Sequence, residues 1–160
     1  MPTPRDTILD HIRSCRTAVI ASLNDDATPH TSYAPFVMKD ERIYLFVSEA
    51  ARHSRNLFER PECSLLFIED ESGAEQIFAR RRVSLECSAE RIPRDVPDFD
   101  TIVAAMERRF GGIVPMLLGM SDFHLVAFTP KAGEAVFGFG DAYTIEQPFE
   151  TILPKRTGHR

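Results

Sequence analysis

Short β-type runs joined by short polar turns fill the chain from residue 17 to residue 47 and limit the folds open to it. The run Thr17–Leu23 is rich in β-branched residues, and Asn24-Asp25-Asp26 after it is typical of a turn. Two more extended runs, Pro29–Met38 and Ile43–Val47, are separated by polar residues only. Because connections this short join antiparallel strands, the sequence predicts an antiparallel meander rather than a doubly wound parallel sheet.

Three segments have helical periodicity. Residues 3–14 begin with Thr3 as N-cap and Pro4 at the first helical position, which is close to a capping box. A second helix is predicted from about Glu49 to Arg60, before Pro61. In the third, Pro97–Phe110, apolar residues recur at steps of three and four. We therefore expect about three helices flanking the strands.

The second half of the chain adds more β-type runs. Four further strands are predicted, the first of them buried on both faces and the last two joined by a turn around Pro130: Ser64–Ile68, Phe78–Ala89, Phe123–Phe128 and Ala135–Phe139. The expected fold is an α+β domain over residues 1–146, with about six or seven strands in an antiparallel barrel or sheet. Residues 147–160 show little periodicity and are predicted to be a tail that is disordered or ordered by a partner.

Composition excludes several classes of protein. The chain is 43% apolar and carries a net charge of −5, which argues against a nucleic-acid coat. Its uncharged apolar runs fall short of the roughly 20 residues of a membrane span, and no signal-like leader opens it. Three cysteines without metal-type spacing make a disulfide scaffold or zinc site improbable. The expectation is a cytoplasmic protein.

The sequence contains no familiar catalytic motif, which leaves the histidines as candidate functional residues. There is no G-x-S-x-G, no H-E-x-x-H and no complete glycine-rich phosphate loop. His53 lies among cationic and hydrogen-bonding residues at 51–56, where it either helps to grip a phosphate or carboxylate or belongs to a solvated helix face. His11 is expected at the surface or in a capping role, and His124 on a barrel face. His159 lies in the predicted tail and therefore has no hydrophobic core to pack against.

The runs, taken in order, resemble a known family. They are similar to the pyridoxamine-phosphate-oxidase-like FMN-binding split barrels, and in particular to the haem iron utilisation proteins of the HugZ/HutZ type. The resemblance covers roughly residues 5–146, and it is carried by the order and spacing of Thr17–Leu23, Pro29–Phe36, Leu45–Leu57, Pro61–Asp70, Met120–Leu125 and Gly138–Tyr143.

This resemblance implies a homodimer of split β-barrels with the ligand at the subunit interface. In the haem-utilising branch, a C-terminal histidine binds the iron and an aspartate of the other subunit hydrogen-bonds that histidine. His159 and Asp122 occupy the matching places, as iron ligand and as catalytic carboxylate. Haem propionates are anionic, so the candidate partners are the cationic residues of the matching segments, with His53 nearby: Arg55, Arg80 and Arg82.

The activity that the resemblance implies is haem-oxygenase-like degradation, with haem as substrate and electrons from an external donor. An FMN-dependent oxidoreductase is the alternative enzyme, in which Ser54, Arg55 and Arg82 would hold the FMN phosphate. A haem carrier without turnover is the non-enzymatic alternative. Fold analogy does not choose among the three.

Overall fold

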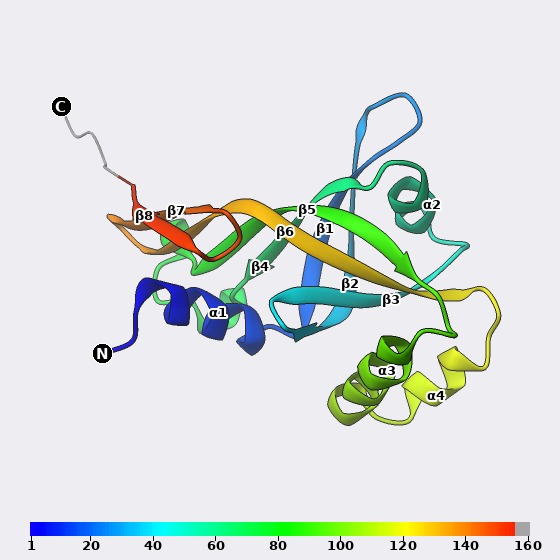
Figure 1. Cartoon of the computed structure of the whole chain (residues 1–160). Coiled ribbons are helices and arrows are strands. Elements are labelled where there is room, and N and C mark those ends of the chain that lie inside the picture. The colour runs from blue at the N-terminus through cyan, green and yellow to red at the C-terminus, as the bar shows by residue number, and fades with distance from the viewer. Residues whose placement is uncertain (156–160) are drawn as a thin grey trace.

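One antiparallel sheet of eight strands organises the chain (Figure 1). The structure is a computed structural model and describes residues 1–155. The strand order is β3-β2-β1-β4-β5-β6-β7-β8, and an additional pairing of β3 with β6 closes the first six strands into a barrel. The α+β antiparallel barrel predicted from the sequence is confirmed. The strands are β1 (Thr17–Leu23), β2 (Pro29–Lys39), β3 (Arg42–Ser48), β4 (Glu62–Ile68), β5 (Arg82–Ile92), β6 (Phe123–Gly138), β7 (Asp141–Glu146) and β8 (Thr151–Pro154).

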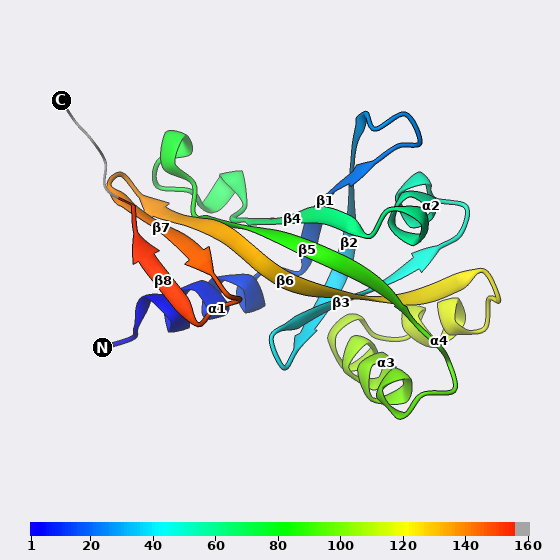
Figure 2. The same cartoon turned by 45° about the horizontal axis from the view of Figure 1, so that its top comes forward.

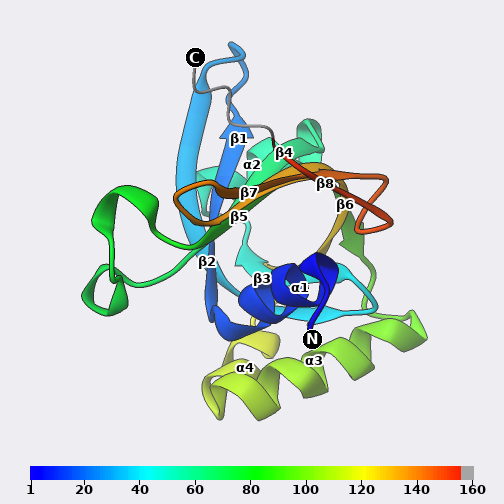
Figure 3. The same ribbon diagram turned by 90° about the vertical axis from the view of Figure 1, so that its left-hand side faces the viewer.

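Four α-helices surround the barrel, namely α1 (Pro4–Ser14), α2 (Arg52–Glu59), α3 (Pro97–Phe110) and α4 (Ile113–Leu118). The predicted capping box of α1 is present, with Thr3 and Asp6 bonded reciprocally. Figure 3 looks along the barrel and shows α1 in front of its near opening. Ile8 and Ile12 of α1 are fully buried in the barrel core, so this helix fills one end of the barrel.

Two clusters of buried apolar side chains hold the strands and helices together. The larger one fills the barrel and includes Phe36, Phe67 and Phe128, all fully buried. The smaller one lies on the outside of the barrel, where α3 packs on β2, β3 and β6 through residues such as Ile102 and Tyr44. The alternation of buried side chains along the strands supplies both clusters, because successive residues of a strand point to opposite faces.

Two predicted elements begin later than expected, and a third is buried differently. The second helix, α2, begins at Arg52 instead of Glu49, and the strand predicted from Phe78 begins at Arg82, after a short 3₁₀ turn at Ile77–Ala79. Strand β4 is not buried on both faces: Leu65 is fully buried, whereas Leu66 is partly exposed. The helix α4 was not predicted, because its six residues are too few to show a helical period.

The two strands predicted around Pro130 are one continuous strand, β6. Pro130 faces Cys87 and Ala132 faces Glu86, so Lys131 is an extra residue of a β-bulge. The proline also lies between the stretch of β6 that pairs with β3 and the stretch that pairs with β7. A proline is tolerated at such a point because no ladder hydrogen bond requires its missing N–H.

The sheet continues beyond residue 146, where the sequence predicted a tail. Strand β8 pairs with β7, and Phe149 in the turn between them is fully buried in the barrel core. The prediction for His11 is also wrong, since the side chain is buried and its Nε2 lies 3.0 Å from the Phe67 carbonyl oxygen. Within residues 1–155, no helix is long and apolar enough to cross a membrane.

Candidate functional site

His53 stands in the first turn of α2, against the barrel wall. Its Nδ1 lies 2.8 Å from Ser32 Oγ of β2, which fixes the orientation of the half-buried ring. Burial lowers the pKa of His53 below its usual value, and the neighbouring His30 lowers it further. The imidazole is therefore held in its neutral form around pH 7, as a hydrogen-bonding group rather than a fixed cation.

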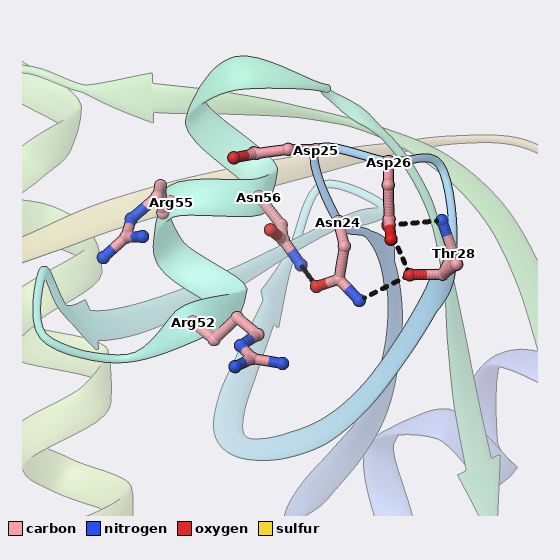
Figure 4. A pocket seen from close by; sticks show the side chains of 7 residues that line it. All are labelled: Asn24, Asp25, Asp26, Thr28, Arg52, Arg55 and Asn56. Atoms are coloured by element: carbon pink, nitrogen blue, oxygen red, sulfur yellow. Dashed lines mark hydrogen bonds between the residues drawn. The ribbon is translucent and has the colours of Figure 1, made fainter.

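Two arginines of α2 border a cavity of about 460 Å³ opposite the loop between β1 and β2 (Figure 4). Arg52 and Arg55 are exposed, and neither forms an ion pair with another residue of the described part of the chain. The N-cap residue Ala51 offers no side-chain cap, so the first amides of α2 also lack a side-chain partner there. Cations at a helix N-terminus are unfavourable unless an anion is present. This end of α2 therefore suits an anionic group on its helix side, while the loop side of the cavity carries Asp25, which is paired with Arg60, and Asp26.

A buried polar network fixes α2 beside that loop. Asn56 is 2% exposed and donates hydrogen bonds to Ser22 Oγ and Asn24 Oδ1, both at 3.1 Å. Asn24 in turn donates to Thr28 Oγ1 at 3.1 Å. Because a buried amide is costly to leave unpaired, this network holds the helix and its arginines at a defined place on the barrel.

Asp122 lies in the turn before β6 and is bonded to the end of β3. Its Oδ2 accepts a hydrogen bond from Ser48 Oγ at 3.3 Å, and its carbonyl oxygen accepts one from the Glu49 amide at 2.8 Å. Ser48 also accepts a bond from Ser54 of α2, at 2.5 Å, through its carbonyl oxygen. Ser48 thus joins Asp122 to Ser54 of α2, the residue that follows His53. Asp122 Oδ1 accepts no hydrogen bond from residues 1–155, and this exposed carboxylate is open to a further partner.

An unpredicted pair lies next to Asp122. His124 Nε2 is 2.5 Å from Glu49 Oε1, and its ring meets the edge of Phe58 at a centroid distance of 5.7 Å. The prediction that His124 belongs to a strand of the barrel is confirmed. Within the described residues, no group of three or more histidine, cysteine or carboxylate side chains is placed to hold a metal ion.

Arg80 and Arg82 lie at the opposite end of the barrel. Arg82 is the first residue of β5 and faces Ile68 and Val136. Its Nη1 donates to the Arg80 carbonyl oxygen at 2.9 Å. Arg80 itself is bonded to the segment after β4, through the Glu69 carbonyl oxygen and an ion pair with Glu71 at 3.5 Å. Figures 1 and 2 both show α2 far from the segment that leads into β5.

The predicted site residues therefore divide into two sets within one chain. His53, Arg55 and Asp122 gather at the α2 end, while Arg80 and Arg82 lie at the end from which the C-terminus departs. The sixth predicted site residue, His159, lies outside the described residues. The Lys155 amide donates to the Ala142 carbonyl oxygen at 2.8 Å, which places the base of the tail beside β7.

A closed antiparallel barrel of six strands with flanking helices defines a split-barrel protein. The pyridoxamine 5'-phosphate oxidase family matches residues 4–137, and the chain belongs to that family. Within it, the chain belongs to the branch typified by HutZ. It is 38% identical over 146 residues to the haem oxygenase HutZ of Vibrio cholerae serotype O1, with 91% of this chain and 83% of that protein covered.

Solved structures agree with this assignment. The crystal structure of HutZ from Vibrio cholerae, described as a haem storage protein, has a TM-score of 0.76 and 35% identity, covering 82% of this chain and 92% of the other. Campylobacter jejuni ChuZ has a TM-score of 0.87 and 31% identity over 96% of this chain, which spans 64% of ChuZ. The fold and the family resemblance predicted from the sequence are confirmed.

Proposed function

We propose that the protein binds haem between two copies of the chain and degrades it oxidatively, with electrons from an external donor. The observation that carries the proposal is the division of the candidate residues between opposite ends of one barrel. The likeness to HutZ supports haem as the ligand, because the two chains are 38% identical over most of their length.

Asp122 and the base of the tail are too far apart to meet within one chain. Lys155 is bonded to Ala142, which pairs with Val136, about fourteen positions along β6 from Asp122. At about 3.3 Å per residue, that length of strand is on the order of 45 Å. His159 is four residues beyond Lys155, and an extended chain of that length spans at most about 14 Å. This difference in length supports a contact between His159 of one copy and Asp122 of a second copy.

A two-fold dimer provides this contact in both directions. If the tail end of one barrel lies against the α2 end of its partner, the same contact recurs by symmetry and two equal sites form. Exposed apolar side chains are present at both ends. Phe78 and Phe139 are 85% and 75% exposed at the tail end, and Ile113 and Met116 of α4 are 50% and 54% exposed on the other side. Apolar surface of this kind is typical of a protein interface.

The residues then have distinct tasks. His159 would bind the iron, and Asp122 would accept a hydrogen bond from the other ring nitrogen through its free Oδ1. Such a carboxylate fixes the imidazole tautomer and raises the electron density at the iron. In this arrangement Arg55, from one copy, and Arg82, from the other, would pair with the propionates, because an arginine fork matches a carboxylate. His53 supplies a neutral hydrogen-bonding group beside them.

The iron–porphyrin supplies the oxygen chemistry, and the protein holds it. With electrons from the external donor, dioxygen would oxidise the ring and remove one bridging carbon as a one-carbon product such as carbon monoxide, leaving iron, water and a biliverdin-like open tetrapyrrole. FMN is the second candidate ligand, favoured by the uncapped first turn of α2 with Arg52 and Arg55, which suits a phosphate. A haem carrier is the third possibility, since the same side chains bind without turnover.

Titration of the purified protein with ferric haem, and separately with FMN, distinguishes the haem-degrading enzyme, the flavin enzyme and the haem carrier. We expect a saturable Soret band with one haem per chain, which decays to a biliverdin-like spectrum once ascorbate and air are added. A stable Soret band under those conditions would identify a carrier instead. Tight FMN binding without a saturable haem signal would overturn the proposal and favour the flavin enzyme.

A further inference from the structure

We propose that Arg94 is a positioning residue for Asp122, acting through the main chain of the turn that carries the carboxylate. The inference rests on the proposed function, because it assigns Arg94 a task in presenting Asp122 to the axial histidine. Arg94 is not among the site residues predicted from the sequence, and the task assigned to it is to hold the main chain of this turn.

The guanidinium of Arg94 donates three hydrogen bonds to carbonyl oxygens on both sides of Asp122. Nη1 donates to Leu118 at 2.8 Å, and Nη2 donates to Met120 at 3.0 Å and to Phe123 at 3.1 Å. Leu118 ends α4, where the last carbonyl groups have no partner within the helix. All three acceptors fall within six residues of chain, and Asp122 is among those residues.

The Arg94 side chain also contacts helix α3. Its guanidinium carbon lies 5.6 Å from the centroid of the Phe99 ring, and Phe99 is buried in the cluster beneath α3. The planar fork of an arginine reaches several acceptors at once, whereas a lysine ammonium is a single point. The side chain thus links the α3 layer to the turn before β6.

The opposite face of the turn is held by β3. The Glu49 amide donates to the Asp122 carbonyl oxygen, and Ser48 Oγ donates to Asp122 Oδ2. Ser48 sets the direction of the carboxylate, while Arg94 sets the backbone on which that carboxylate stands. Asp122 is exposed and has no packing of its own to fix it. A carboxylate that must meet an imidazole from another chain requires such support, because functional groups work only within about 0.5 Å of their place.

The first test uses the haem-free protein and Arg94→Ala, with Arg108→Ala as the matched control. Arg108 is an exposed arginine of α3 whose side chain makes no hydrogen bond or ion pair within residues 1–155. We expect amide exchange in residues 118–124 to speed up about tenfold or more in Arg94→Ala, since local hydrogen bonds set exchange protection. The control should match the wild type, and Arg94→Lys should be intermediate. If exchange in this turn is unchanged in Arg94→Ala, the inference fails.

The second test reads the iron–imidazole stretch of the ferrous haem complex by resonance Raman spectroscopy. We expect Arg94→Ala to shift this band toward the position found in Asp122→Asn, and to cause no further shift in the double variant. Additive shifts, or a wild-type band in Arg94→Ala beside a shifted band in Asp122→Asn, would overturn the role of Arg94 and leave the proposed function standing. If Arg94→Ala does not fold, Arg94→Lys is scored by the same criteria. Absence of a saturable haem signal in the wild type would remove the proposed function itself.

Discussion

At the scale of single residues, the main prediction concerns the iron ligand. In His159→Ala we expect the Soret shift caused by an axial imidazole to be lost from the ferric haem complex, because no other side chain is assigned to the iron. His30→Ala is a control for the iron ligand alone, since it removes an imidazole of β2 that neighbours His53 but is assigned no bond to the iron. A His159→Ala spectrum equal to that of the wild type would refute the assignment of the ligand.

A second residue-scale prediction concerns the carboxylate. Asp122→Asn keeps the size of the side chain but removes the charge that supports the imidazole, so we expect an intact dimer with altered haem affinity or turnover. Light scattering and a haem titration with ascorbate measure the two properties. Normal affinity together with normal turnover would remove Asp122 from the site.

Local chemistry was predictable from the sequence where one residue bonds a near neighbour. The capping box of Thr3 and Asp6 is confirmed because its partners are three residues apart. The bond from Ser48 to Asp122 joins residues 74 positions apart, and nothing near either residue signals it. His11 was misplaced for the same reason, since β4, which buries it, lies some fifty residues further along the chain.

At the scale of elements, the contact of α1 with β4 predicts a pH dependence of stability. Burial lowers the pKa of His11 below its usual 6.5, an effect only partly offset by the Phe67 carbonyl. The unfolded chain therefore takes up a proton at a higher pH than the folded chain does. Stability is full above about pH 6.5 and is lost as the pH falls from there toward the lower pKa of the folded state.

His11→Gln tests this dependence, because glutamine keeps a donor for the Phe67 carbonyl but does not titrate. We expect thermal unfolding followed between pH 7.5 and 5.5 to show a smaller decrease in Tm for this variant than for the wild type. His11→Ala should cost about 1–3 kcal/mol at pH 7.5, because it leaves that buried carbonyl without its partner. An equal slope in His11→Gln and wild type would assign the acid sensitivity to other groups, with His53 the next to test.

The pairing of β5 with β6 predicts a strict requirement for glycine at position 133. A Cβ atom there would collide with the Ser84 carbonyl oxygen of the neighbouring strand, and the strand backbone cannot move aside. We expect Gly133→Ala to lower the free energy of unfolding by about 1–3 kcal/mol in a urea titration. Gly73→Ala, where no atom lies within 4 Å of the added carbon, should be close to neutral. Similar midpoints for the two variants would contradict this account.

Most elements were predictable because their periodicity is local, as for β1 and α3, whose predicted limits match the structure. The exceptions follow from pairing over longer distances. Pro130 indicated a turn, but the bulge opposite Cys87 accommodates it inside β6. Likewise, β8 has only four residues, and its pairing with β7 identifies it as a strand where its own sequence does not.

At the scale of the whole molecule, a site divided between two chains predicts complementation between two defective variants. In a random mixture of Asp122→Asn and His159→Ala chains, half of the dimers contain one chain of each kind, and each of these has one intact site. About a quarter of all sites should then show the wild-type iron–imidazole band, although neither variant shows it alone. Each variant incubated by itself through the same exchange procedure is the control. A site built within one chain would give no wild-type band in the mixture, whatever the degree of exchange.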